Sequence, residues 1–238
     1  MLKIKRLGFV MVFFACFFLS ENFYGQKINQ FDANKKRTGV WKKYYPNKRI
    51  RYQGQFKEGK EIGIFKYYDI SDSRYPIITK KFNEENDSVA VSFYSISGKK
   101  QSEGVFVNKK RVGKWVYYFD KDNIMSTEFY VDGKLDGKVI NYYPNGKATE
   151  ITHYKMGLKY GLSQKFSSAG ILIEEVNYKN DKENGIAKYF ELNGNLKETG
   201  EYKNGKRVGE WEFYLDGEIA SDEDNKKKKT FTKPKKNK

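Results

Sequence analysis

One phrase recurs along this chain at a fixed interval, and it restricts the possible folds more than any other feature. The segment GEYKNGKRVGEWEFY at 200–214 is nearly repeated by EGVFVNKKRVGKWVYY at 103–118. A glycine stands before the last aromatic phrase of each unit, and we call it the anchor glycine. The anchor glycines, most of them 24 residues apart, are Gly39, Gly63, Gly113, Gly137, Gly161, Gly185 and Gly209. A period in the range of about 20–50 residues is typical of repeat proteins, whose units pack against their neighbours.

Two aromatic positions keep a constant distance from the anchor. Five residues after it stand Tyr44, Tyr68, Tyr94, Tyr118, Tyr142, Phe166, Phe190 and Tyr214. Seven residues before it stand Phe56, Phe82, Phe106, Tyr130, Tyr154, Tyr178 and Tyr202. The first unit has Asp32 there, with Phe31 beside it, which suggests a slip of one residue. One degenerate unit has Val89 as its anchor, and we expect its two extra residues within 69–76, where Pro76 and polar residues indicate an altered loop.

The turn residues predict what each unit forms. Asn-Gly and Asp-Gly, as in KNGKRV and VDGKLD, supply the positive φ angles of tight hairpin turns. A second turn, such as YPNGK at 143–147, follows each aromatic strand, and the segments between turns are rich in strand-forming residues. We therefore predict an all-β fold, an elongated array of about eight 24-residue β-hairpins in a continuous antiparallel meander of sixteen strands. Strand alternation places Trp211 and Phe213 on one face and Tyr214 on the other.

The pattern Tyr-x-Asn-Gly-Lys-x-x-Gly-x-Trp-x-x-Tyr resembles the MORN-repeat variant of bacterial proteins, many of them named as YwqK-type toxin–antitoxin antitoxins. The resemblance covers essentially residues 27–219 and is best in 200–214. It implies a repeat protein and, through the family name, an antitoxin-like protein that neutralises a protein partner. The chain departs from the pattern at Val89, Ser163 and Ala187, where we expect looser packing.

The N-terminal residues predict export. Lys3, Lys5 and Arg6 precede an apolar run at 7–19, which has the length of a signal-peptide core and is shorter than the roughly 20 residues of a membrane-spanning helix. We assign residues 1–25 to a signal peptide and expect a periplasmic, cell-surface or secreted protein. An uncleaved anchor is the alternative. Cys16, the only cysteine, follows a partial lipobox, so a lipoprotein is a less favoured alternative.

The remaining chain divides by charge and composition. Residues 26–220 form the predicted repeat domain, and residues 221–238 form a Lys-rich tail without apolar periodicity, which we expect to be disordered. The net charge of +16 favours an anionic partner. The tail is a candidate for binding an anionic lipid surface. Nucleic acid is not expected as a partner of an exported chain.

Few residues are candidates for chemistry. His153 is the only histidine, and no second histidine or mature cysteine can join it. Glu150, Glu174 and Glu198 share the position eleven residues before the anchor; this row could bind a cation or a basic partner, but we favour exposed strand positions facing lysines. Gly-Lys pairs such as Gly205-Lys206 are predicted turns, because no helix pattern follows them. We therefore predict no catalytic, cofactor-binding or metal-binding residue, no cofactor, and no enzyme.

Four functions remain open at this point. The favoured one is an exported, non-enzymatic repeat scaffold that binds a protein or an envelope polymer through an extended aromatic and basic sheet surface, as in VWKKYYPNKRIRY at 40–52. The second is peripheral association with an anionic membrane. The third is antitoxin-like neutralisation of a protein partner, which rests on the resemblance alone. A glycan-acting enzyme is the least favoured.

Overall fold

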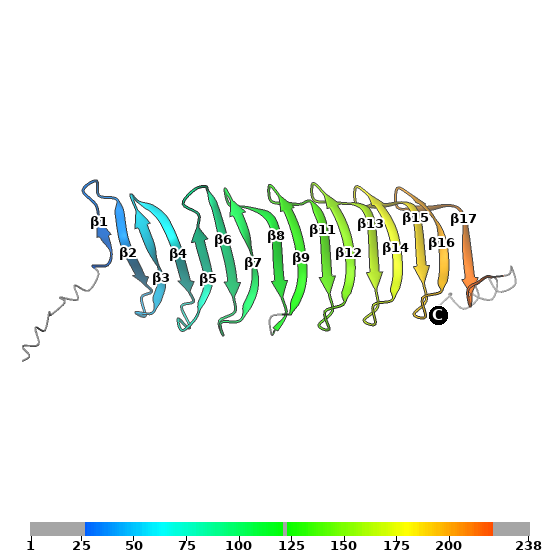
Figure 1. Cartoon of the computed structure of the whole chain (residues 1–238), viewed down its shortest axis with the longest axis horizontal. Coiled ribbons are helices and arrows are strands. Elements are labelled where there is room, and N and C mark those ends of the chain that lie inside the picture. Colours follow the sequence, from blue (N-terminus) through cyan, green and yellow to red (C-terminus); the bar gives the residue numbers. More distant parts are fainter. Residues whose placement is uncertain (1–26, 121–122, 221–238) are drawn as a thin grey trace, which may run out of the picture.

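The protein is one open sheet in a single layer, long and ribbon-shaped (Figure 1). The computed structural model describes residues 27–120 and 123–220. Each strand pairs antiparallel with the next along the chain, which confirms the predicted meander of hairpins. The strands are β1 (Gln30–Phe31), β2 (Arg37–Tyr44), β3 (Ile50–Lys57), β4 (Lys60–Tyr68), β5 (Pro76–Phe82), β6 (Ser88–Tyr94), β7 (Lys100–Val107), β8 (Lys110–Tyr118), β9 (Ile124–Val131), β10 (Lys134–Leu135), β11 (Gly137–Tyr142), β12 (Ala148–Lys155), β13 (Leu158–Phe166), β14 (Leu172–Lys179), β15 (Lys182–Phe190), β16 (Leu196–Lys203), β17 (Lys206–Leu215) and β18 (Glu218–Ile219).

The described chain has 18 strands where sixteen were expected, for two local reasons. β10 and β11 are one expected strand, interrupted at Asp136, whose amide donates a hydrogen bond to the carbonyl of Phe129 (2.9 Å). β18 is a short return strand beyond the last repeat, and it pairs with the end of β17. The expected slip at the first unit is confirmed, because the ring of Phe31 packs against Trp41 at a centroid distance of 5.1 Å.

The anchor glycine allows a bulge in the second strand of each regular hairpin. Val112 pairs with Val105 and Val116 with Glu103, so residues 113–115 lie opposite the single residue Gly104. Gly113 has a φ of 65°, which an L side chain rarely adopts. The hairpin of the degenerate unit has no register shift, and its Val89 pairs directly with Phe82. Without the bulge, the turn of that hairpin widens to the loop at 83–87.

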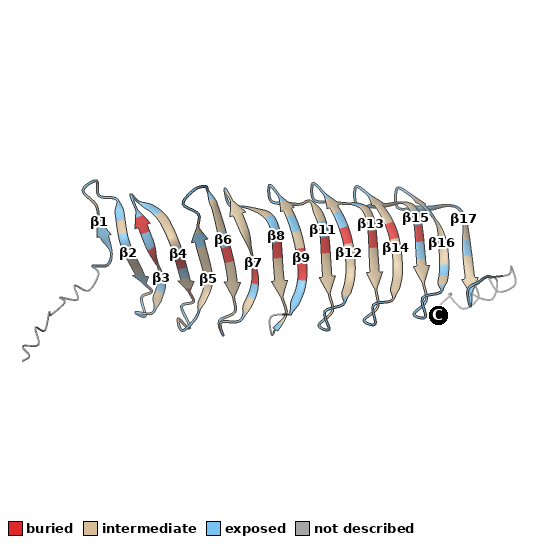
Figure 2. Ribbon diagram, viewed as in Figure 1, coloured by how far each residue is buried: buried red, intermediate tan, exposed pale blue. Residues whose placement is uncertain are grey.

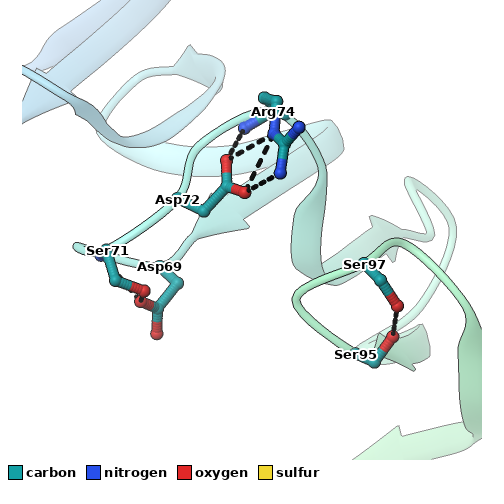
Figure 3. Close-up of polar contacts among 6 residues, drawn as sticks. All are labelled: Asp69, Ser71, Asp72, Arg74, Ser95 and Ser97. Carbon is teal, nitrogen blue, oxygen red and sulfur yellow. Dashed lines mark hydrogen bonds and ion pairs between the residues drawn. The ribbon is translucent and has the colours of Figure 1, made fainter.

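The two extra residues of the degenerate unit lie where the sequence placed them, in the loop at 69–75 between β4 and β5. Asp69 accepts hydrogen bonds from the amide and the hydroxyl of Ser71, and Asp72 accepts from the amide and the guanidinium of Arg74 (Figure 3). In the next turn on the same edge, the hydroxyls of Ser95 and Ser97 lie 2.8 Å apart. These contacts are local to each turn and hold the longer loop in shape.

One face of the ribbon, which we call the packed face, holds nearly all of the buried side chains. Two residues after each anchor stand Trp41, Phe65, Val91, Trp115, Val139, Ser163, Ala187 and Trp211. The six inner members of this row are buried, and the row crosses the middle of the sheet (Figure 2). Ser163 and Ala187 are 2% and 0% exposed, so the expectation of looser packing is wrong there. The opposite face, which we call the open face, carries most of the exposed strand residues.

The space along this row stays filled because each row residue faces a position of the same hairpin, nine residues before the anchor, whose residue differs in size. A large row residue faces a small residue, and a small row residue faces a larger one. Phe65, Trp115 and Trp211 each lie against a glycine; these glycines are Gly54, Gly104 and Gly200. A Cβ on Gly104 would meet Trp115 at 2.3 Å. In the units whose packed residue is small, the facing residue is larger; Ser163, for example, pairs with Thr152, and Ala187 with Val176. A large ring therefore requires a bare backbone beside it.

Edge-to-face ring contacts link consecutive units along the packed face. Phe65 has centroid distances of 5.2 Å to Phe56 of its own hairpin and 5.5 Å to Phe82 of the next. Trp115 makes the corresponding contacts with Phe106 at 5.0 Å and Tyr130 at 6.4 Å. Such geometries are favourable beyond the apolar area that they bury. The aromatic residue seven positions before the anchor is thus the link between units.

Hydrogen bonds also join neighbouring turns at both edges of the ribbon. At the short-turn edge (top in Figure 1), the amide of Gly133 donates to the carbonyl of Arg111 and that of Gly205 to the carbonyl of Glu183, both at 2.9 Å. At the opposite, long-turn edge, the Tyr143 hydroxyl donates to the carbonyl of Phe166 at 3.0 Å. Strand pairing therefore joins every unit to the next, and ring contacts and turn contacts strengthen many of these connections.

We predict that Gly104→Ala destabilises the protein by about 1–3 kcal/mol, because its methyl group would overlap the indole of Trp115. The φ angle at Gly104 lies outside the range that strains an L residue, so backbone strain does not contribute. Urea unfolding checks the change in free energy. In the Trp115→Val background the same substitution should cost much less; equal costs in both backgrounds would contradict the steric explanation.

Candidate functional site

The acidic row predicted at Glu150, Glu174 and Glu198 lies on the packed face, half-buried among basic residues. Lys159 Nζ lies 3.8 Å from a carboxylate oxygen of Glu150, and Lys165 Nζ lies 2.9 Å from one of Glu174. Arg207 forms an ion pair and hydrogen bond with Glu198. Each carboxylate is thus paired with a cation of its own sheet, as the favoured interpretation of this row expected, but the expectation that the three positions are exposed is wrong.

Arginines cover the indole rings of the packed face. The guanidinium carbon of Arg111 lies 4.7 Å from the ring centroid of Trp115, and that of Arg207 lies 3.9 Å from the centroid of Trp211. Arg37 takes the same position over Trp41 at 5.0 Å. A cation over an indole face is favourable, so these arginines stabilise the repeat and shield its rings from solvent. Much of the predicted aromatic surface is therefore used for packing.

A polar cluster lies beside the central tryptophan. Arg111 Nη1 donates hydrogen bonds to the hydroxyls of Tyr117 and Tyr130, each at 2.9 Å. The Tyr130 hydroxyl donates to a carboxylate oxygen of Glu128 at 2.5 Å. Burial, followed by the charge of Glu128, raises the pKa of Tyr117. These hydrogen bonds are all made within the cluster, and its place in the packed face indicates a structural role.

Other tyrosines of this face show the same electrostatic effect. Burial, together with the nearby charge of Glu61, raises the pKa of Tyr67 to about 12. Burial, together with the charge of Glu183, raises the pKa of Tyr178 to about 12. Their phenolate forms are disfavoured because charge is poorly solvated there.

We predict that the native protein loses stability as the pH rises from about 10 to about 12. In that window the unfolded chain releases the protons of Tyr67 and Tyr178, whereas the folded chain keeps them, so ionisation favours the unfolded state. In the native protein, tyrosinate absorbance should show a fraction of tyrosines that ionise at higher pH than the rest. In urea this late-ionising fraction should be absent. Identical native and denatured titration curves would contradict this prediction.

His153 lies exposed on the open face, apart from any catalytic grouping. Its Nδ1 lies 2.8 Å from the carbonyl oxygen of Leu162, and since a carbonyl only accepts, Nδ1 carries the proton and donates. Within residues 27–120 and 123–220, no three His, Cys, Asp or Glu side chains are grouped so that they could hold a metal ion. The predicted lack of catalytic and metal-binding residues stays a prediction.

The Gly-Lys pairs lie in hairpin turns, as predicted. Asn204 and Gly205 both have positive φ angles, of 51° and 80°, and β17 follows them directly. Gly146 lies in the long turn after β11, where Lys147 Nζ donates to the carbonyl of Ala169 at 2.5 Å. A phosphate-binding loop would lead into a helix, and these turns lead into strands.

The degenerate unit carries a hollow that the sequence did not predict. A groove of about 570 Å³ lies where β4, β5 and the loop at 83–87 meet, and its lining includes Glu61, Glu84, Glu85, Asp87 and Phe82. The acidic segment NEEND at 83–87 is the sequence feature that could have indicated this groove. Nothing in the structure indicates a ligand for this groove.

Apolar side chains cross the open face at one height of the sheet. The position after each anchor pairs with the position eight residues before the next anchor, as in Lys114 with Phe129 and Ile186 with Glu201. Ile64, Phe129 and Ile186 are 53%, 44% and 51% exposed. We call the row formed by Val40, Ile64, Phe129, Leu162 and Ile186 the apolar belt. No second layer of the described chain covers it.

Lysines line the short-turn edge on the same side as the open face. They flank the two-residue turns, six or three residues before each anchor, and all are exposed. We call them the lysine row; its members are Lys36, Lys57, Lys60, Lys110, Lys134, Lys155, Lys179, Lys182, Lys203 and Lys206. Lys57 pairs directly with Lys60, Lys179 with Lys182, and Lys203 with Lys206. Like charges directly opposite each other destabilise a sheet.

We predict that Lys182→Glu stabilises the fold by a few tenths to about 1 kcal/mol at low salt, because it replaces a repulsive cross-strand pair by an attractive one. Urea unfolding at low and high salt checks the gain and its screening. Lys134→Glu is the matched control, because Lys134 faces Val131. Equal effects of the two substitutions would contradict the role of the pair.

The predicted signal peptide at 1–25 and the Lys-rich tail at 221–238 lie outside the described residues. Among the residues that the structure does describe, no helix is both long and apolar enough to cross a membrane. Export, lipidation and membrane association through the tail therefore stay predictions.

The fold and its surfaces define a single-layer β-hairpin repeat protein. Comparison with known families refines this class: the model of the MORN repeat variant matches four segments, residues 37–58, 135–156, 159–180 and 183–204. No curated protein matches the chain. MORN repeats generally serve as protein-binding modules and are generally not catalytic. The assignment to antitoxin-type proteins is not confirmed and stays a prediction.

Proposed function

We propose that this chain is an exported, non-enzymatic scaffold that binds a protein partner along the apolar belt. The observation that carries the proposal is the exposure of Ile64, Phe129 and Ile186 on a sheet whose other face is already packed. The belt residues share one height of the open face, with polar neighbours such as Lys114 and Glu201 between them, and together they offer a partner a row of apolar contacts. The general protein-binding role of MORN repeats supports the same conclusion.

The charges around the belt favour a partner with an acidic rim. Lys114 and Lys138 lie exposed between the apolar members of the belt, and Lys66 and Lys188 lie exposed beside it, two residues along the strands of Ile64 and Ile186. On the packed face, by contrast, charges are paired within the sheet, as in the ion pairs of Glu150, Glu174 and Glu198. Complementary charge at the rim of an interface accelerates and orients association. The open face therefore supplies both the apolar contacts and the positive charges that would orient the partner.

The proposed binding takes place outside the cytoplasm. Export of the chain is inferred from its N-terminal sequence. The basic start of the chain and its short apolar run at 7–19 are typical of a signal peptide. The N-terminal sequence of the protein isolated from cells tests export. A mature chain that begins near residue 26 in the envelope or the medium supports it, and a full-length cytoplasmic chain contradicts it.

We predict that Ile64→Glu, Phe129→Glu and Ile186→Glu, combined in one chain, abolish partner binding and leave the fold intact. The measurement is recovery of envelope proteins on the immobilised full chain, with far-ultraviolet circular dichroism as the check on folding. The control carries Ile96→Glu and Leu192→Glu, two exposed apolar residues in long turns, at the opposite edge from the lysine row. One saturable protein lost only with the belt variant supports the proposal, and equal recovery by all three chains contradicts it.

A further inference from the structure

We propose that the lysine row binds a linear anionic polysaccharide that lies along the short-turn edge from β8 to β17. This site is separate from the apolar belt, and it goes beyond the protein binding proposed above. The lysines concerned flank the regular turns of the later units; they are Lys110, Lys134, Lys155, Lys179, Lys182, Lys203 and Lys206.

The repeat sets these lysines at a constant pitch. Equivalent lysines of successive units lie two strands apart, which corresponds to roughly 9.5 Å at the usual separation of paired strands. The tight turns hold the backbone beside them, since the amide of Asp181 donates to the carbonyl of Lys159 and that of Gly205 to the carbonyl of Glu183. The positive charges thus lie at strand ends whose positions the repeat fixes, with a gap at Leu158, and they can follow a polymer that carries charges along its length.

Most of these charges lack an acidic partner within the described chain. Lys110 lies 2.7 Å from a carboxylate oxygen of Asp132, but the structure shows no ion pair for Lys179, Lys182, Lys203 or Lys206 among the residues that it describes. The last four form two cross-strand pairs of like charge. An anion between the two ammonium groups of a pair would convert their repulsion into attraction. The arrangement therefore costs stability in the free protein and favours an anionic ligand.

The shape of the edge favours a polymer over an anionic membrane surface. Three of the four turn tips between β9 and β17 are polar, namely Asp132-Gly133, Asn180-Asp181 and Asn204-Gly205, and the fourth exposes Met156, so a bilayer would meet mostly polar tips at this edge. The wider loop at 83–87 carries Glu84, Glu85 and Asp87 at the same edge. This loop would repel a flat anionic surface, whereas a polymer needs to follow only the part of the edge beyond it.

The side chains around the row also favour a polysaccharide over single-stranded nucleic acid. Sites for single strands interleave cations with aromatic side chains on which the bases stack. Beside this stretch of the row stands the exposed ring of Tyr160, and Lys155 Nζ lies 5.5 Å from its centroid. The strands next to Lys179 and Lys203 direct Tyr178 and Tyr202 to the packed face instead. The row thus offers charge and few stacking platforms.

The test is binding of a fluorescently labelled polygalacturonate chain to the full-length protein, followed by anisotropy at several salt concentrations. The variant combines Lys179→Gln, Lys182→Gln, Lys203→Gln and Lys206→Gln. Since a lysine near an anionic surface contributes on the order of 1 kcal/mol, we expect the loss of four to lower the affinity by roughly a hundredfold to a thousandfold and to weaken the salt dependence. The C-terminal lysines are the same in all proteins compared.

The control combines Lys66→Gln, Lys114→Gln, Lys138→Gln and Lys188→Gln, which change the net charge equally at mid-strand positions of the open face. Retention of binding by this control supports the proposal. Equal losses in variant and control would overturn it, as would no binding of the polymer at low salt. Tighter binding to single-stranded DNA or to phosphatidylserine vesicles, with the same dependence on the four edge lysines, would also overturn the assignment to a polysaccharide. Binding of the belt partner is measured on the unsubstituted protein and on the edge variant, neither of which changes the lysines beside the belt, so failure here leaves the proposed function separately testable.

Discussion

The contact of a large aromatic ring with the backbone of a glycine stabilises each unit of this ribbon that carries such a ring. Trp115 can reach the backbone of the neighbouring strand only because position 104 has no side chain. A single-layer sheet has no second sheet to cover its rings, so burial must come from within the hairpin and from the adjacent units. Where the ring is absent, as at Ser163, the facing Thr152 replaces part of the lost volume, and both residues are buried. Burial is thus conserved across units even though the residues are not.

The fold could be predicted because its signals are local and repeated. Turn residues, strand-forming segments and the spacing of the anchors all point to the same meander, and the long loop at 69–75 followed from the change in period. The small residues at 163 and 187 were misjudged, because each was assessed by itself. Their packing depends on residues eleven positions earlier in the same hairpin, a relation that becomes visible only once the strands are paired in register.

The candidate surfaces could be predicted only in part. Alternation separates the two faces of a strand, but it does not say which aromatic rings are used for packing and which remain exposed. The arginines at 37, 111 and 207 could not be assigned a role from the sequence, and the structure places them over indoles of the packed face. The direct opposition of Lys179 and Lys182 required the register of the hairpin, as did the height shared by Phe129 and Ile186. Charge therefore divides between the two faces in a way that composition does not reveal.

The loss of one anchor glycine has a mechanical consequence. At the short-turn edge, bonds between neighbouring turns join Gly59 to Arg37 and resume with Gly133 and Arg111, and none is formed in the described residues between these two points. The same stretch contains Val89, the hairpin without a bulge, and the gap between the first and second matched repeats. Fewer cross-ties mean a lower local resistance to deformation. We therefore expect the ribbon to bend more easily in this stretch than in the two spans beside it, where bonds between neighbouring turns add to the strand pairing.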